Sequence, residues 1–200
     1  MNAVRRVAGR AVPLDRENVD TDQIIPAGWL KQIGRTGYAA GLFEAWRRDG
    51  AFVLNDPRYR GATILLAGAN FGCGSSREHA AWALIEAGFG AVVAPSFADI
   101  FRENALRNGL VPVALPREVV AALMRAVEHD PSLELVVDVE RATLSAPRLE
   151  ASFPLDASAR AKLLGGLDDI ALTLRHTDAI AAYERARPDW LPAIRQGRAS

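Results

Sequence analysis

The sequence contains a single cysteine, Cys73, among its 200 residues. One cysteine excludes a disulfide within the chain, and it also excludes a cysteine-ligated iron–sulfur cluster held by this chain alone. An excess of charge of either sign is lacking too, because 24 Lys and Arg residues balance 24 Asp and Glu residues. Proteins that bind nucleic acid by neutralising phosphates need a basic excess, so this balance argues against that class.

Long hydrophobic runs are also lacking. No apolar stretch approaches the roughly 20 residues that a membrane-spanning helix needs. The charged first ten residues are not followed by the apolar run of a signal peptide. Half of the residues are hydrophobic, which is enough for a substantial core. We therefore expect a soluble cytoplasmic protein that does not associate with a membrane.

Apolar runs alternate with helical patterns in the middle of the chain. Residues 62–67 form an apolar run between two glycines and predict a buried strand, which a helix over residues 77–87 should follow. The next unit repeats this order. It predicts a strand at residues 91–94 and then a helix that opens at Ser96, in capping-box spacing with Asp99, and ends at Gly109.

The remaining elements complete a mixed sheet. Residues 110–115 predict a strand, and Pro112 within it indicates an edge position or a strand end. Strands that alternate with helices, together with strand pairs near the ends, predict an α/β domain with a mixed sheet flanked by helices. The other predicted elements are an amphipathic helix over 117–128, a hairpin of 133–139 and 142–146, and tail elements over 157–164, 167–174 and about 177–188.

The strongest chemical signal is the segment Gly-Cys-Gly-Ser-Ser-Arg-Glu-His at residues 72–79. It lies between the first predicted strand and its helix, and its two glycines allow a tight turn and the close approach of a ligand. The N-terminus of a helix attracts anions, and the guanidinium group of Arg77 suits a carboxylate. The segment therefore predicts a cradle for a carboxylate or phosphate with hydroxyl groups at its centre.

A structural interpretation of the same segment stays open. Ser75 and Glu78 have the spacing of a capping box, which alone would explain both residues. Arg77 would then be a solvated charge, and His79 would be a packed core histidine. The two interpretations are compatible, because the helix dipole would favour the alkoxide of a serine at the N-cap.

Other active-site motifs fit the segment less well. A dinucleotide fingerprint, a Walker loop and a nucleophile elbow each lack a required residue. A thiol nucleophile at Cys73 with His79 as its base is also weak, because nothing in the sequence places the imidazole against the sulfur.

Three further segments are polar or rich in glycine. Residues 20–23, Asp-Thr-Asp-Gln, favour a polar turn, with a carboxylate that orients an arginine as the alternative. The adjacent carboxylates of Asp168 and Asp169 indicate a capping role or a loop. Residues 26–41 contain four glycines and predict a long exposed loop, and long ordered loops are often functional.

Six blocks of this sequence together resemble the small subunits of 3-isopropylmalate dehydratase, a branch of the aconitase superfamily. The resemblance runs in order from about residue 11 to residue 192. The Gly-Ser-Ser-Arg-Glu-His block is shared by the whole superfamily, and the other blocks are more typical of the isopropylmalate branch. The blocks are Val19–Pro26, Arg35–Tyr38, Asn70–Ala80, Ala94–Phe101, Asn108–Leu110 and Gly166–Ile170.

The resemblance implies a fold, a partner and a reaction. The fold would be the swivelling β/β/α domain of aconitase, here a separate chain that spans residues 1–200 and ends in a helical extension over 157–200. The partner would be a large subunit, joined in a heterodimer, that carries a [4Fe–4S] cluster, so that this chain itself would bind no metal or cofactor. The reaction would interconvert 2-isopropylmalate and 3-isopropylmalate through isopropylmaleate, by dehydration and rehydration in leucine biosynthesis.

The resemblance also implies roles for residues in two of the blocks. Ser75 would be the catalytic base, acting as an alkoxide on the carbon-bound proton of a small diacid. Arg77 would hold a substrate carboxylate and help to keep Ser75 ionised, and Asp22 would support this arrangement. Ser76 and nearby backbone N–H groups, with Gly74 in the same turn, would bind carboxylate oxygens.

Residues 26–41 would form the loop that sets substrate specificity. Trp29, Leu30 and Ile33 would give an isopropyl group apolar contact, although Lys31 and Arg35 lie in the same loop. Gly28 and Trp29 depart from the pattern expected of the family. The departure leaves the exact substrate open, with a related hydro-lyase subunit for citraconate, dimethylmaleate or homoaconitate as the alternative. A separate hypothesis is a non-enzymatic swivel or anion-binding module.

Overall fold

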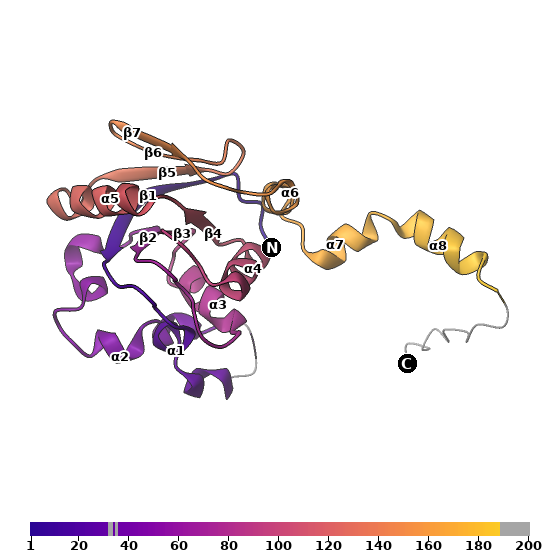
Figure 1. The fold of residues 1–200 in the computed structure, drawn as a ribbon. Helices are drawn as coiled ribbons and strands as arrows, with labels where there is room; N and C mark the ends of the chain where they lie inside the picture. The colour runs from indigo at the N-terminus through magenta and orange to yellow at the C-terminus, as the bar shows by residue number, and fades with distance from the viewer. Residues whose placement is uncertain (32–33, 35, 189–200) are drawn as a thin grey trace.

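A seven-stranded mixed sheet organises the chain (Figure 1), with the strand order β4-β3-β2-β1-β5-β6-β7. The computed structural model describes residues 1–31, 34 and 36–188, apart from the side chain of residue 169. The strands are β1 (Arg6–Leu14), β2 (Ile64–Ala67), β3 (Ala91–Ala94), β4 (Val111–Ala114), β5 (Glu134–Asp138), β6 (Thr143–Ala146) and β7 (Leu149–Ser152).

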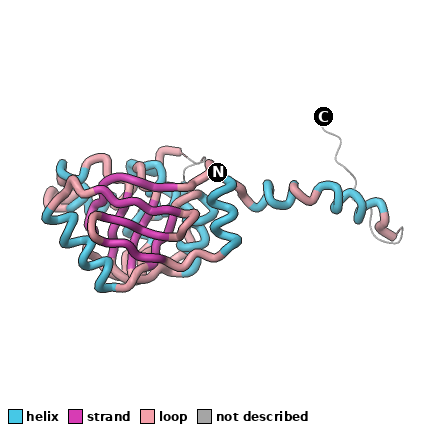
Figure 2. The backbone as a smooth tube through the Cα atoms, turned by 90° about the horizontal axis from the view of Figure 1, so that it is seen from above, coloured by secondary structure: helices cyan, strands magenta, loops and turns pink. Residues whose placement is uncertain are grey.

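Strand β1 joins two halves of the sheet that are built differently. Its residues 11–14 pair in parallel with β2, whereas its residues 6–10 pair antiparallel with β5. The strands β2, β3 and β4 continue the parallel half, and β5, β6 and β7 form the antiparallel half. Seen from above, strands of the two halves run across one another (Figure 2), so the sheet curls over at β1.

Helices cover both sides of the parallel half (Figure 1). The helices that follow β2 and β3, α3 and α4, lie on one side, and α5 lies on the other. This cover explains why β2 and β3 are apolar and buried at every position, whereas β5 alternates between buried and more exposed residues. The helix bounds are α1 (Thr21–Ile24), α2 (Glu44–Arg47), α3 (Glu78–Glu86), α4 (Asp99–Asn108), α5 (Arg117–His129), α6 (Ala157–Gly165), α7 (Asp169–Leu174) and α8 (Thr177–Arg185).

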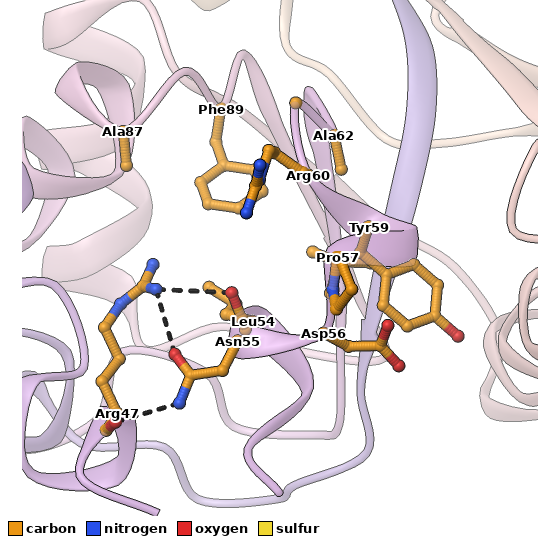
Figure 3. Close-up of a pocket in the computed structure, with 12 residues that line it drawn as sticks. Arg47, Leu54, Asn55, Asp56, Pro57, Tyr59, Arg60, Ala62, Ala87 and Phe89 are labelled. Carbon is orange, nitrogen blue, oxygen red and sulfur yellow. Dashed lines mark hydrogen bonds between the residues drawn. The ribbon is translucent and has the colours of Figure 1, made fainter. Parts of the chain in front are cut away.

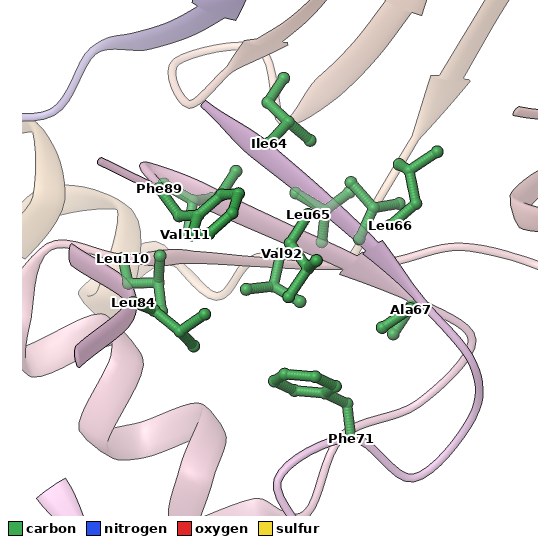
Figure 4. Close-up of a cluster of buried hydrophobic side chains, with 14 of the residues drawn as sticks. Ile64, Leu65, Leu66, Ala67, Phe71, Leu84, Phe89, Val92, Leu110 and Val111 are labelled. Carbon is green, nitrogen blue, oxygen red and sulfur yellow. The ribbon is translucent and has the colours of Figure 1, made fainter. Parts of the chain in front are cut away.

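The core lies between the parallel strands and these helices (Figure 4). Leu65 and Val92 from the sheet, Leu84 from α3 and Phe71 from the loop after β2 are fully buried together. Phe71 stacks edge-on against Phe101 of α4, with 5.2 Å between the ring centroids. The loop after β2 is therefore part of the core at its base, which fixes the position of the residues that follow it.

The α/β fold with a mixed sheet, predicted from the sequence, is confirmed. The strand at residues 91–94, the hairpin of β5 and β6, and the left-handed C-cap at Gly109 are observed as predicted. Strand β4 lies at an edge of the sheet, as Pro112 indicates. Strands β1 and β7 were not predicted as elements.

Two predicted element starts are wrong. The strand predicted at residues 62–67 is β2, and it begins at Ile64 rather than at residue 62. Helix α4 begins at Asp99 with Ala98 as its N-cap, and no side chain caps it. Ser96 does not open the helix because its hydroxyl accepts a hydrogen bond from the backbone N–H of Asn70, at 2.9 Å. Ser96 thus ties the loop after β2 to the loop after β3.

The chain ends in helices that leave the body of the protein (Figures 1 and 2). Helix α6 still packs on the body: Leu163 is fully buried, and its carbonyl accepts a hydrogen bond from the N–H of Val4 at 2.7 Å. Helices α7 and α8 then project outward in both views, and α8 ends at Arg185, a little before the predicted end near residue 188. Among the helices within the described residues, none is long and apolar enough to cross a membrane.

Candidate active site

The loop between β2 and α3 is held by backbone hydrogen bonds with two other segments, residues 19–21 and the loop after β3. The N–H of Phe71 donates to the carbonyl of Ser96 at 3.0 Å, and the N–H of Gly72 donates to the carbonyl of Val19 at 2.7 Å. The N–H of Thr21 donates to the carbonyl of Cys73 at 2.9 Å. These bonds fix the path of the loop up to Cys73.

Gly72 is required at its position for two reasons. Its φ of +77° is one that L-residues rarely adopt. A Cβ atom there would also overlap the ring of Phe101. The tight turn that was predicted from the glycines is therefore real, and it brings the next residues to the surface.

Ser75 lies at the exposed end of this turn. Its carbonyl accepts a hydrogen bond from the buried hydroxyl of Thr21, at 2.9 Å, which fixes the backbone. Gly74, Ser75 and Ser76 are all exposed, and within the described residues the hydroxyl of Ser75 makes no hydrogen bond. A serine with a fixed backbone and an unoccupied hydroxyl is suited to contact a ligand rather than to hold the fold together.

The predicted capping box of Ser75 and Glu78 is wrong. The N-cap of α3 is Arg77, whose backbone is extended with φ −131° and ψ 106°, and no side chain caps the helix. Glu78 is turned elsewhere and accepts a hydrogen bond from Nδ2 of Asn108 at 2.8 Å. The N–H of Ala80 donates to the carbonyl of Arg77 at 3.2 Å. The N–H groups of Glu78 and His79, at the start of α3, are therefore left for solvent or for an anionic ligand.

Arg77 is paired with Asp22 in a two-pronged ion pair. Nη2 of Arg77 lies 2.8 Å from Oδ2 of Asp22, Nη1 contacts Oδ1, and Nη1 also donates to the carbonyl of Ile25 at 3.2 Å. The side chain of Arg77 is only 11% exposed, whereas that of Asp22 is 56% exposed. The solvated-charge interpretation of Arg77 is therefore wrong, and the carboxylate that orients an arginine is present.

Asp22 is itself held in place by a short helix. Residues 21–24 form α1, and Asp20 caps it: the N–H of Gln23 donates to Oδ1 of Asp20 at 2.8 Å, and the N–H of Asp20 donates to Oε1 of Gln23 at 2.9 Å. The favoured interpretation of residues 20–23 as a plain polar turn is thus corrected to a capped helical turn. Its role is to present the carboxylate of Asp22 to Arg77.

His79 is a packed residue, as the structural interpretation predicted. Its ring lies 5.2 Å from that of Tyr38 and 4.6 Å from that of Trp82, between centroids and nearly edge-on in both cases. Burial lowers the pKa of His79 from its ordinary value of 6.5. The first of the two adjacent carboxylates with a predicted capping role is also confirmed: Asp168 caps α7 by accepting from the N–H of Ala171 at 2.7 Å.

The predicted specificity loop contains two short 3₁₀ helices, Ala27–Lys31 and Tyr38–Gly41. The indole of Trp29 donates to Oε2 of Glu44 at 2.8 Å and packs closely against Gly41. Leu30 is half-buried and Lys31 is exposed. Ile33 and Arg35 lie outside the described residues, so their predicted roles remain predictions.

Glu86 fixes the C-terminal end of that loop, and sequence analysis missed it. Its Oε2 accepts from the N–H of Tyr38 at 2.6 Å and from the N–H of Ala39 at 3.1 Å. Arg77 holds the residues before the loop through Asp22 and Ile25. Helix α3 therefore carries Arg77 at its N-terminus and anchors both ends of the loop. An acidic residue in the apolar run Leu84–Ala87 was the only signal in the sequence.

A cavity of about 400 Å³ lies elsewhere on the molecule (Figure 3). Arg47 on its wall is committed to the fold, because Nε donates to the carbonyl of Leu42 at 2.9 Å and Nη1 donates to that of Leu54 at 3.3 Å. Its burial lowers the pKa of the guanidinium group. None of the predicted site residues lines this cavity.

The described residues offer no metal site. No group of three or more His, Cys, Asp or Glu side chains among them is arranged to hold a metal ion. Cys73 is the single cysteine of the chain, and a [4Fe–4S] cluster takes several thiolates. The residues of this chain therefore do not fit a cluster of their own.

The family models match both ends of the chain. The model of the aconitase C-terminal domain matches residues 1–118. The model of the C-terminal domain of the 3-isopropylmalate dehydratase small subunit matches residues 169–194. The first match identifies the class of this domain as an aconitase-type swivel domain, as the motif in the loop after β2 indicated.

Curated relatives narrow this class. The 3-isopropylmalate dehydratase small subunit of Frankia alni is 56% identical over 193 residues, which cover 96% of this chain and 99% of the relative. That of Rubrobacter xylanophilus is 52% identical over 194 residues, covering 97% and 100%. The crystal structure of a Methanocaldococcus jannaschii 3-isopropylmalate dehydratase shares the fold, with a TM-score of 0.63, 24% identity and coverage of 88% of this chain and 98% of that one. This chain belongs to the 3-isopropylmalate dehydratase small subunit family.

Proposed function

We propose that this chain, together with a large subunit, interconverts 2-isopropylmalate and 3-isopropylmalate by dehydration and rehydration in leucine biosynthesis. The observation that carries this proposal is the pairing of Arg77 with Asp22, two residues after the exposed Ser75 in the same turn. A guanidinium group with a fixed orientation, a serine with an unoccupied hydroxyl and the uncapped N-terminus of α3 lie at one turn. Such a site is suited to a substrate with carboxylate groups.

Ser75 is the proposed catalytic base. A serine hydroxyl is too weak an acid to work as a base at neutral pH unless its surroundings stabilise the alkoxide. The guanidinium group of Arg77 and the N-terminus of α3 supply positive potential next to it, and this potential grows when a partner excludes water. The alkoxide takes the proton from the substrate carbon and returns it to the neighbouring carbon on rehydration.

Arg77 and its neighbours are proposed to bind and orient the diacid. The carboxylate of Asp22 and the carbonyl of Ile25 accept from Nη1 and Nη2 and hold the plane of the guanidinium group. The remaining N–H donors of Arg77 are proposed to bind a substrate carboxylate. The hydroxyl of Ser76 and the backbone N–H groups near Gly74 receive carboxylate oxygens. The half-buried Leu30, with Ile33 and Trp29 in the same loop, gives the alkyl group of the substrate apolar contact.

The large subunit is proposed to hold the [4Fe–4S] cluster, since the single cysteine of this chain cannot supply the several thiolates that such a cluster takes. When bound there, the cluster supplies a Lewis acid for the departing hydroxyl group. The active enzyme therefore needs both subunits, and we place it in the cytoplasm.

Reconstitution with the large subunit tests the proposal. The two chains are co-expressed, purified anaerobically and assayed against isopropylmalate, citraconate, dimethylmaleate and homoaconitate. We expect the highest kcat/KM on isopropylmalate and no turnover by either chain alone. Turnover of another diacid in its place would assign the chain to a related hydro-lyase. A stable complex that is inactive on all four would contradict the proposed reaction.

A further inference from the structure

Exposed large apolar side chains gather on the C-terminal arm, which we define as residues 167–188. Side chains of this kind are expected inside a folded protein or at an interface. Across the described part of the chain, five of them are well exposed, and only Ile100 lies outside the arm. The four on the arm are Ile170, Leu174, Ile180 and Tyr183, at 71%, 63%, 38% and 69% exposure.

Within the described residues, α7 and α8 are not extensively packed against another helix or strand of the chain. Helices α7 and α8 have six and nine residues and project away from the body (Figures 1 and 2). Helices this short are marginal in water on their own, and most helical stability in proteins comes from packing of an apolar face. A surface outside this chain is therefore needed to stabilise the arm as a helical segment.

The apolar side chains are spaced to meet such a surface. Ile170 and Leu174 are four residues apart on α7, and Ile180 and Tyr183 are three apart on α8, so each pair shares one face of its helix. The rest of α8 and the joint before it hold small residues, mostly alanine, and charged residues, among them Arg175 and Glu184. Each helix thus presents two adjacent apolar anchors rather than a polar surface.

The position of the arm indicates which partner it contacts. Its first residues, Leu167 and Ile170, line a hollow of about 210 Å³ together with Glu78. Glu78 is the first residue of α3 and directly follows Arg77, so the arm starts near the N-terminal end of α3, which the cluster-bearing subunit must approach if the proposed function holds. The model specific to small subunits spans residues 169–194, whereas the aconitase C-terminal model ends at residue 118. The arm therefore belongs to the version of this domain that is a separate subunit.

We infer that the C-terminal arm is a non-covalent tether, whose apolar anchors dock on the large subunit and hold the face of Ser75 and Arg77 against it. This inference rests on the proposed function for the identity of the partner. A separate chain has no peptide link to keep the two halves of the site together. The apolar arm adds affinity between this chain and the large subunit, and it does so without contacting the substrate.

Binding measurements on the full-length chain test this inference. The affinity of the anaerobically purified large subunit is measured by calorimetry for wild type and for the double variant Leu174→Ser/Tyr183→Ser. The matched control is Arg175→Ser/Glu184→Ser, which changes the same arm and leaves both the net charge and the apolar anchors unchanged. Circular dichroism and the Tm of the isolated chain should be alike for all three, because the arm lies outside the core.

We expect the apolar double variant to bind at least about thirty-fold more weakly and the control to bind within about three-fold of wild type, as two buried anchors would require. The kcat of the variant should recover when it is added in excess. Equal affinity of variant and wild type would overturn the inference. The inference would also be overturned if the wild-type chain were a dimer by itself and the apolar double variant were a monomer. The apolar side chains of the arm would then contact a second copy of this chain. If the variant binds weakly but the wild-type pair has no hydro-lyase activity, the tether stands and the proposed reaction fails.

Discussion

Arg77 and Asp22 are 55 positions apart in the chain, and they form a two-pronged ion pair in which the arginine is nearly buried and the aspartate is half exposed. The same guanidinium group donates to the carbonyl of Ile25, just before the predicted specificity loop. One side chain thus joins the N-terminus of α3, helix α1 and the start of the loop. The pair is a positioning device for the arginine as well as an ion pair.

Removing the charge of Asp22 should therefore impair activity more than stability. For Asp22→Asn in the reconstituted enzyme we expect kcat/KM to fall roughly 10- to 100-fold, because the guanidinium loses its fixed plane. The free energy of unfolding should change by no more than about 1 kcal/mol, as for other partly exposed pairs. Glu17→Gln, which breaks an exposed ion pair with Arg117, is the control and should leave both quantities unchanged. An unaltered kcat/KM in Asp22→Asn would remove Asp22 from the site.

Ser75→Ala should separate catalysis from folding even more sharply. We expect kcat to fall by at least about 10³-fold, since the variant lacks the hydroxyl that is proposed to take the carbon-bound proton. Stability should stay within about 0.5 kcal/mol, because the Ser75 side chain is exposed and makes no hydrogen bond in the described structure. Ser76→Ala is the matched comparison and should mainly raise KM. If the two variants had equal kcat values, Ser75 would not be the base.

Local patterns in the sequence predicted the parallel half of the fold because its strands are continuous apolar runs and its helices end at clear signals such as Gly109. Strand β1 was missed because it contains Pro13, which argues against a central strand. The structure accommodates Pro13 because the pairing of β1 with β5 ends at Arg10, so no ladder bond to β5 is lost there.

At the candidate site, local patterns in the sequence located the segment but not the partners of its residues. The segment of residues 72–79 was predicted to be an anion cradle, because glycines, hydroxyls and an arginine before a helix are a local signal, and this role stays a prediction. The spacing of Ser75 and Glu78 pointed to the wrong cap, because Thr21 fixes the Ser75 backbone and Asn108 binds Glu78. Such partners come from distant segments, and spacing within one segment cannot reveal them.

Glu86 should prove to be a positioning residue for the loop of residues 26–41. Glu86→Ala leaves the N–H groups of Tyr38 and Ala39 without their acceptor, and we expect this to cost roughly 2 kcal/mol or more in urea unfolding. Glu86→Gln keeps an acceptor oxygen and should cost about 1 kcal/mol. In the reconstituted enzyme the alanine variant should raise KM more than it lowers kcat.

The matched control for Glu86 is Glu103→Ala, an exposed acidic residue on α4. It should leave stability and KM at their wild-type values. A Glu86→Ala variant with a normal KM but reduced stability would limit Glu86 to a structural role, and the loop would then owe its position to other contacts.

The pH dependence of stability should report the packing of His79. Burial between Tyr38 and Trp82 lowers its pKa in the folded protein below the ordinary value of 6.5, so the unfolded chain binds the proton more tightly. The stability that this neutral histidine contributes is therefore complete above about pH 6.5 and is lost as the pH falls from there towards the lowered pKa. His79→Phe keeps an aromatic ring and removes the titration. Urea midpoints of both proteins at pH 7.5, 6.5 and 5.5 should show wild type losing stability relative to the variant at acidic pH, since the carboxylates that also titrate there are common to both. Parallel pH profiles would mean that the imidazole is as easily protonated in the fold as in water, and that the ring is not packed as described.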